Sequence, residues 1–89
     1  MRERTIEKYL VDVVNTLGGE CWKWSGRIGV PDRICFFPGG RVVFVEVKQK
    51  TGRLSKMQMH IHEKLRNLGM DVRVVWSKDD VDELVRQIF

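Results

Sequence analysis

Apolar side chains recur every three or four residues in three stretches of the chain, the spacing that places them on one face of a helix. The first stretch runs from Arg4 to Leu17. Each of the other two follows a serine suited to a capping box, Ser55 with Gln58 and Ser77 with Asp80. The expected apolar stripes are Ile6, Leu10, Val13, Val14 and Leu17 in the first helix, Met57, Ile61, Leu65 and Leu68 in the second, and Val81, Leu84, Val85 and Ile88 in the third.

Four further segments concentrate β-branched and aromatic residues, which predicts β-strands. Pro38-Gly39-Gly40 carries the turn chemistry that joins two of them into a hairpin. The resulting order is αβββαβα, so we expect an α/β fold with one mixed β-sheet flanked by helices, the last of them at the C-terminus. A chain of 89 residues has room for a single domain, residues 1–89. The predicted strands cover residues 20–24, 33–37, 41–48 and 71–76.

The composition, 43% hydrophobic and 31% charged, is typical of a folded globular domain. No segment approaches the roughly 20 apolar residues that cross a bilayer, and the N-terminus does not lead into the apolar core of a signal peptide. We therefore expect an intracellular protein. Chains this short bury only about two-thirds of their unfolded surface, which favours a homo-oligomer, in the first instance a dimer.

The cysteines and histidines do not suggest a zinc site or a disulfide framework. Cys21 and Cys35 are too few for either, so we expect two reduced thiols in the core. His60 and His62 are two residues apart, which fails the four-residue spacing of a helical zinc pair. We expect both histidines to be solvated helix residues.

A net charge of +4 favours a polyanionic partner, because contacts from lysine and arginine to phosphate release counterions. Six basic residues flank the segments discussed below and could hold the phosphates of DNA; the alternative is a solvated basic face. Trp22 and Trp24 are expected to lie in the core rather than to stack on bases. The six are Lys23, Arg27, Arg33, Lys50, Arg53 and Lys56.

Counting back from the hairpin turn brings two acidic residues together. If Phe37 faces Arg41, then Asp32 lies opposite Glu46, with Cβ atoms about 5 Å apart on one face of the sheet. Such a carboxylate pair becomes favourable with a divalent cation between its members, and oxygen ligands suit Mg²⁺ or Mn²⁺. Alternation also places Lys48 on the face of Glu46. A slip of one residue in the turn would break this pairing.

This arrangement favours phosphodiester hydrolysis. A metal held by two carboxylates polarises a phosphodiester and lowers the pKa of bound water, and a neighbouring ammonium can orient that water. The alternative is structural: Asp32 caps a strand after Pro31, while Glu46 and Lys48 form a solvated pair.

The pattern of Pro31-Asp32 followed by Glu46-Val47-Lys48 resembles the PD-(D/E)XK nuclease superfamily. Together with Gly29-Val30 and the helical Gln58, it is similar to the VRR-NUC family, whose small stand-alone members occur in phages and bacteria. The resemblance implies a restriction-endonuclease-like αβββαβ core and a location in the cytoplasm of a bacterium or a phage-infected host. It also implies that Asp32, Glu46 and the backbone carbonyl of Val47 bind the metal and that Lys48 assists the attacking water.

The same resemblance assigns roles to two further residues. Glu7 corresponds to an acid on the first helix that can complete the metal shell; otherwise it is a solvated acid beside the apolar stripe. Gln58 would support the site from the second helix, and its place in the capping box gives it a structural role as well.

Our leading hypothesis is a Mg²⁺- or Mn²⁺-dependent DNA endonuclease. The resemblance suggests branched, flapped or four-way-junction substrates. The alternatives are a non-catalytic module that binds nucleic acid or protein on the same fold, and a subunit whose site works only within a larger assembly.

Overall fold

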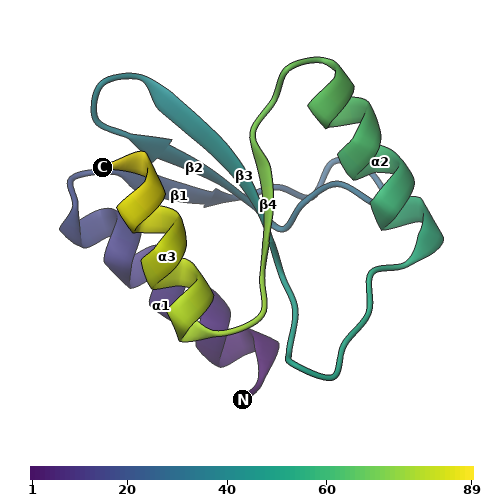
Figure 1. Cartoon of the computed structure of the whole chain (residues 1–89), viewed down its shortest axis with the longest axis horizontal. Helices are drawn as coiled ribbons and strands as arrows, with labels where there is room; N and C mark the ends of the chain where they lie inside the picture. The colour runs from purple at the N-terminus through teal and green to yellow at the C-terminus, as the bar shows by residue number, and fades with distance from the viewer.

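The computed structural model describes residues 1–89 and has the predicted order of elements. Helices and strands alternate as αβββαβα, and each strand boundary lies within two residues of its predicted position. Figure 1 shows the arrangement. The elements are α1 (Glu3–Thr16), β1 (Glu20–Lys23), β2 (Arg33–Phe37), β3 (Arg41–Val47), α2 (Lys56–Asn67), β4 (Val72–Val75) and α3 (Lys78–Ile88).

The four strands form one mixed sheet in the order β1-β2-β3-β4, antiparallel except for the parallel pair β3 and β4. The parallel pair needs a crossover, and α2 supplies it. The predicted hairpin register is confirmed, since Phe37 faces Arg41 and the ladder continues to Arg33 opposite Val45. Gly39 and Gly40 adopt φ values of 90° and 83°, which only glycine enters without strain, so the turn is closed in the way its sequence predicts.

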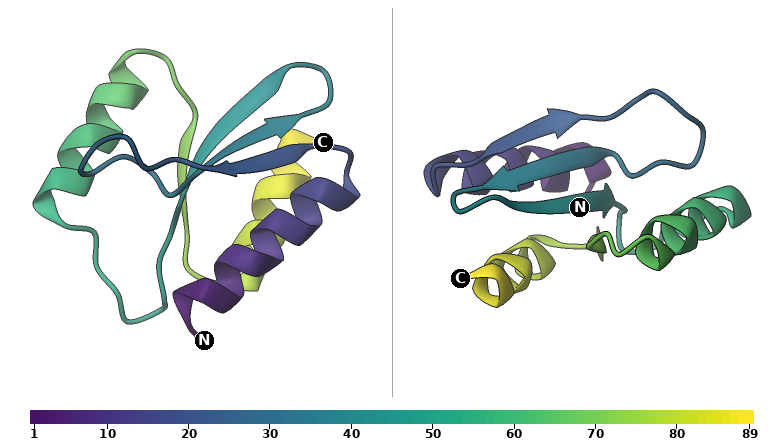
Figure 2. Two further views of the ribbon diagram at one scale, coloured as in Figure 1. Left: turned by 180° about the vertical axis from the view of Figure 1, so that it is seen from behind. Right: turned by 90° about the horizontal axis from the view of Figure 1, so that it is seen from above.

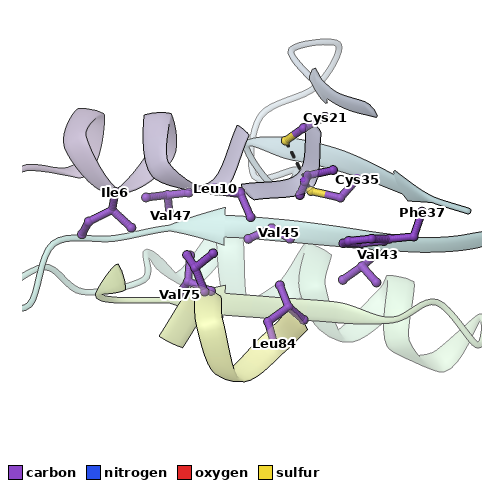
Figure 3. Packing of buried hydrophobic residues seen from close by; sticks show 12 residues of the cluster. Ile6, Leu10, Cys21, Cys35, Phe37, Val43, Val45, Val47, Val75 and Leu84 are labelled. Carbon is purple, nitrogen blue, oxygen red and sulfur yellow. Dashed lines mark hydrogen bonds between the residues drawn. The ribbon is translucent and has the colours of Figure 1, made fainter. Parts of the chain in front are cut away.

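The main core lies between one face of the sheet and the pair α1 and α3, which lie side by side in Figures 1 and 2. The alternating residues Val43, Val45 and Val47 of β3 are at most 1% exposed and point into this core, as expected from the period of two. Figure 3 shows them between the helices. The side chains they meet include Ile6, Leu10 and Val14 from α1, Val75 from β4, and Val81 and Leu84 from α3.

Cys21 and Cys35 lie in this core as free thiols, which confirms the prediction for them. They face each other across β1 and β2, with their Sγ atoms 3.4 Å apart (Figure 3). No helix of the structure is long and apolar enough to span a membrane.

The opposite face of the sheet is covered only in part, by α2. Predictions for α2 and for the tryptophans fail on this face. The expected stripe of α2 is largely exposed, 48% for Met57 and 74% for Leu68, while Ile61 is buried together with His62, which was expected in solvent. Trp22, expected in the core, is 57% exposed and lies beside Phe36, with ring centroids 4.7 Å apart. Trp24 is half-buried against Phe44.

The loop between β1 and β2 packs tightly against α2 at Gly29. This residue has a φ of 89°, and a methyl group in place of its hydrogen would come within 2.8 Å of side-chain atoms of both Met57 and Ile61. Only glycine allows the loop to approach so closely. The contact fixes the stretch Val30-Pro31 that leads into Asp32, and Pro31 is buried.

Candidate active site

Asp32 and Glu46 meet at the end of the hairpin, one step beyond the last pair of the β2–β3 ladder. The predicted approach of the two carboxyl groups is therefore confirmed. Glu46 is only 2% exposed. Its burial, followed by a hydrogen-bonded contact and charge repulsion from Asp32, raises the pKa of Glu46 to about 8. Asp32 is itself held in place, because its Oδ2 accepts a hydrogen bond of 2.8 Å from the backbone N–H of Val47.

Two side chains of α2 approach Glu46 from the other side. The amide Nε2 of Gln58 lies 3.4 Å from Oε2, and Nε2 of His62 lies 3.3 Å from Oε1. Gln58 also forms the predicted capping box: its Oε1 accepts from the N–H of Ser55, and its own N–H donates to the Ser55 hydroxyl. Gln58 therefore caps α2 and approaches Glu46 at the same time.

His62 is the site residue that sequence reasoning did not identify. It is fully buried, burial lowers its pKa, and its Nδ1 has no hydrogen-bond partner. Its position follows from helical spacing, because residues four apart share a face, and His62 is four residues after Gln58. A glutamine directed at the site therefore places His62 there too.

Lys48 directly follows β3 and is half-buried. Its backbone N–H donates to the carbonyl oxygen of Val75, which continues the parallel ladder beyond its last paired residues. Its ammonium is near enough to Glu46 to oppose the rise in the pKa of that carboxyl. Lys48 therefore shares the site with the two acids, as alternation along the strand predicts.

Glu7 is held away from the two acids by cations. Its Oε2 lies 2.7 Å from Nε of Arg33 and 3.2 Å from Nζ of Lys23. Burial acts to raise the pKa of Glu7, but the two cations outweigh it and hold that pKa below its ordinary value. On α1 it is Glu3, one turn earlier, whose charge contributes to raising the pKa of Glu46.

The six basic residues separate into different surroundings. Lys23 and Arg33 are paired with Glu7, and Arg33 also donates to the carbonyl oxygen of Cys21. Arg27 lines a small pocket beside α2. The remaining three, Lys50, Arg53 and Lys56, line an open pocket next to the site and take part in none of the ion pairs of the chain.

The donor set fits a hard divalent cation. Two carboxyl groups share one point, and the pKa of Glu46 is raised first by burial and then by Asp32, with Lys48 opposing the rise only in part. A cation between them would offset this repulsion. No third side chain of His, Cys, Asp or Glu joins them in a metal-binding arrangement, so further ligands would be backbone oxygens, water or substrate.

Comparison with known proteins gives three consistent similarities. Residues 3–79 match the VRR-NUC domain family. A protein of Acyrthosiphon pisum secondary endosymbiont phage 1, named "Putative nuclease p44", is 41% identical over 81 residues, which cover 89% of this chain and 87% of that protein. A solved structure described as a VRR_NUC domain superposes with a TM-score of 0.91 at 36% identity and covers 98% of this chain and 97% of its own.

Proposed function

Because this chain belongs to the VRR-NUC family of nuclease domains, we propose that it is a metal-dependent DNA endonuclease that hydrolyses phosphodiester bonds. The observation that carries the proposal is the meeting of the Asp32 and Glu46 carboxyl groups beside Lys48. A purely structural role gives no reason to place a half-buried acid in contact with the buried Glu46, where it raises the cost of ionising that carboxyl.

Asp32, Glu46 and the backbone carbonyl of Val47 would hold the metal, for which Mg²⁺ or Mn²⁺ is proposed. A divalent cation bound there supplies a Lewis acid for the phosphodiester and lowers the pKa of bound water. Hydrogen bonds within the protein already orient the two proposed carboxylate ligands. The N–H of Val47 holds Asp32, while Gln58 and His62 hold the two oxygens of Glu46. Such fixed surroundings keep both carboxylates from turning away when substrate arrives.

Lys48 is the proposed catalytic cation. Its ammonium lies beside Glu46 rather than in an ion pair with a single surface acid. From there it can orient the attacking water or offset the negative charge that develops on the phosphate in the transition state. Gln58 is proposed to act through Glu46, as a positioning residue.

The proposed substrate is DNA, with a preference for branched, flapped or four-way-junction structures. The unpaired cations Lys50, Arg53 and Lys56 beside the site support a contact with the phosphate backbone. A homodimer stays a prediction, and the mass of the protein in solution measures it.

A nicking assay on circular duplex DNA tests the site. The wild type should nick DNA with Mg²⁺ or Mn²⁺ and not with EDTA, and Asp32→Asn or Lys48→Ala should abolish nicking. Asp12→Asn and Lys8→Ala are matched controls, since these residues form an exposed ion pair on α1, and both should cut like the wild type. Equal cleavage by the wild type and the two site variants would contradict the assignment. A panel of linear duplex, single strand, flap and four-way junction then tests the substrate preference.

A further inference from the structure

The largest pocket of the molecule adjoins the candidate active site and contains an aromatic side chain. It is open to solvent, has a volume of about 990 Å³, and is lined by eight residues from the loop after β3, the start of α2 and the end of β4. That volume is at the upper end of the range of about 300–1,000 Å³ seen for ligand pockets. The lining residues are Lys50, Thr51, Gly52, Arg53, Leu54, Lys56, Met59 and Trp76.

The charge of the pocket is entirely positive. Lys50, Arg53 and Lys56 contribute three cations, and no acidic residue lines it. None of the three forms an ion pair elsewhere in the chain. A smaller neighbouring pocket shares Lys50 and Trp76 but includes Asp79, which disfavours an anion there. The larger pocket is therefore the one suited to phosphate.

Trp76 lies on the same side of the sheet as the candidate active site. In the parallel pair, Glu46 is opposite Val74, and the N–H of Lys48 reaches the carbonyl of Val75. Alternation from Val74 then directs Trp76 to the face of Glu46 and Lys48. Gly52, also in the pocket wall, lies near the stem of Lys48, because a methyl group added at Gly52 would be 3.6 Å from the Cδ of Lys48. The pocket therefore adjoins the site.

We propose that this pocket binds an unpaired nucleotide of the DNA substrate, next to the phosphodiester that is cut. The base stacks on Trp76, and the adjoining phosphates are held by Lys50, Arg53 and Lys56. The inference rests on the proposed function, since it extends the same site to its substrate.

The combination of groups indicates an unpaired nucleotide rather than a duplex. Within a duplex both faces of each interior base are covered by neighbouring bases, so away from the duplex ends an aromatic side chain can stack only on a base that has left the helix. Phosphate contacts alone would need only the cations. Here the tryptophan is accompanied by the apolar side chains of Leu54 and Met59, which suit the flat, weakly polar surface of a base. The substrate should therefore carry a flap, an overhang or a frayed end at the cleavage position.

A binding experiment tests the pocket apart from cleavage. Affinity is measured by fluorescence anisotropy in EDTA for a duplex with a short single-stranded extension and for the same DNA with abasic sites in that extension. The wild type should bind the abasic form about tenfold more weakly, since stacking on an aromatic side chain contributes about 1–3 kcal/mol per base. Trp76→Leu should bind both forms with the lower affinity, and Trp76→Phe should keep most of the difference. Trp22→Leu removes an exposed tryptophan outside the pocket and should behave as the wild type.

Equal binding of natural and abasic extensions by the wild type would contradict the proposal that this pocket binds an unpaired nucleotide. This result is informative even if Trp76→Leu does not fold. The result is also separable from the proposed function. A protein that distinguishes the two DNAs but never cleaves would overturn the nuclease assignment alone. One that cleaves yet ignores the missing base would overturn the pocket alone.

Discussion

The Nε2 atom of His62 lies 3.3 Å from Oε1 of Glu46, and both side chains are almost fully buried. Burial lowers the pKa of His62, so its imidazole is neutral near pH 7 and can donate one hydrogen bond to Glu46 once a bound cation has ionised that carboxyl. A partner of this kind orients a metal-binding carboxylate, and its loss typically costs 10–100-fold in metal affinity or activity.

We predict that His62→Leu lowers the affinity for Mn²⁺ by about 10–100-fold with little loss of stability. Stability should be spared because Nδ1 is buried without a partner, and removing it relieves an unmet hydrogen bond. His62→Gln retains an N–H donor and should recover part of the affinity. Calorimetric titration with Mn²⁺ and thermal unfolding in EDTA measure the two quantities. Equal affinity in all three proteins would show that His62 only fills space.

Without metal, Glu46 should contribute a loss of stability as the pH rises from about 4.5 to about 8. The pKa of Glu46 is raised from 4.5 to about 8, so in this window the folded state keeps a proton that the unfolded chain releases. The folded state binds more protons, and the unfolding free energy therefore falls with pH. Urea denaturation in EDTA at several pH values measures the slope. Glu46→Gln should flatten it, and an unchanged slope in this variant would assign the effect to other groups.

Glu7→Gln should reduce stability more than it affects metal binding. Glu7 is held by Arg33 and Lys23, and its side chain and that of Arg33 are 18% and 21% exposed, so the loss should be on the order of 1 kcal/mol. Urea denaturation measures this loss, and titration with Mn²⁺ measures the affinity, which should change less than twofold. A tenfold weaker affinity would instead support the role of metal ligand that the family resemblance implies.

Gly29→Ala should destabilise the protein by about 1–3 kcal/mol more than Gly39→Ala, because it adds a steric clash. Both glycines have φ values near 90°, so both substitutions carry the same backbone strain. Only at Gly29 does the added methyl group meet Met57 and Ile61, whereas at Gly39 nothing lies within 4 Å. Chemical denaturation measures the difference. Similar losses at the two positions would mean that the loop can move away from α2.

Arg53→Ala should weaken binding to all DNA sequences and make it less dependent on salt. Removing one cation from a DNA phosphate reduces the slope of log affinity against log salt concentration by about 0.9. Lys8→Ala, an exposed cation already paired with Asp12, should leave the slope unchanged. Titrations at several salt concentrations distinguish the two variants. An unchanged slope for Arg53→Ala would mean that Arg53 does not contact a DNA phosphate.

Local signals were sufficient to predict the elements and the hairpin. A turn that accepts positive φ at Gly39 and Gly40 determines the register of β2 and β3, and the register alone brings Asp32 to Glu46. Three alternating valines then decide which face is core. These features depend on neighbours in sequence, so they can be derived without knowing the rest of the fold.

The errors arose where burial depends on distant elements. Leu68 continues a regular apolar stripe, yet it is exposed at the C-cap of α2. Trp22 is exposed beside Phe36, on the face of the sheet that lies away from the main core. The pairing of Glu7 with Arg33 joins residues 26 positions apart, and no local pattern indicates it. His62 was also missed, because the buried face of each helix was predicted from apolar residues alone.

The amide of Gln58 closes the first turn of α2 with its oxygen and approaches Glu46 with its nitrogen. Fraying of that turn, a motion far smaller than global unfolding, would therefore release a contact to the carboxylate. If Gln58 positions Glu46 as proposed, activity depends on the integrity of this turn. On heating, the protein should lose activity while most of its sheet is still intact, because the first turn of α2 would then limit the working temperature before the core does.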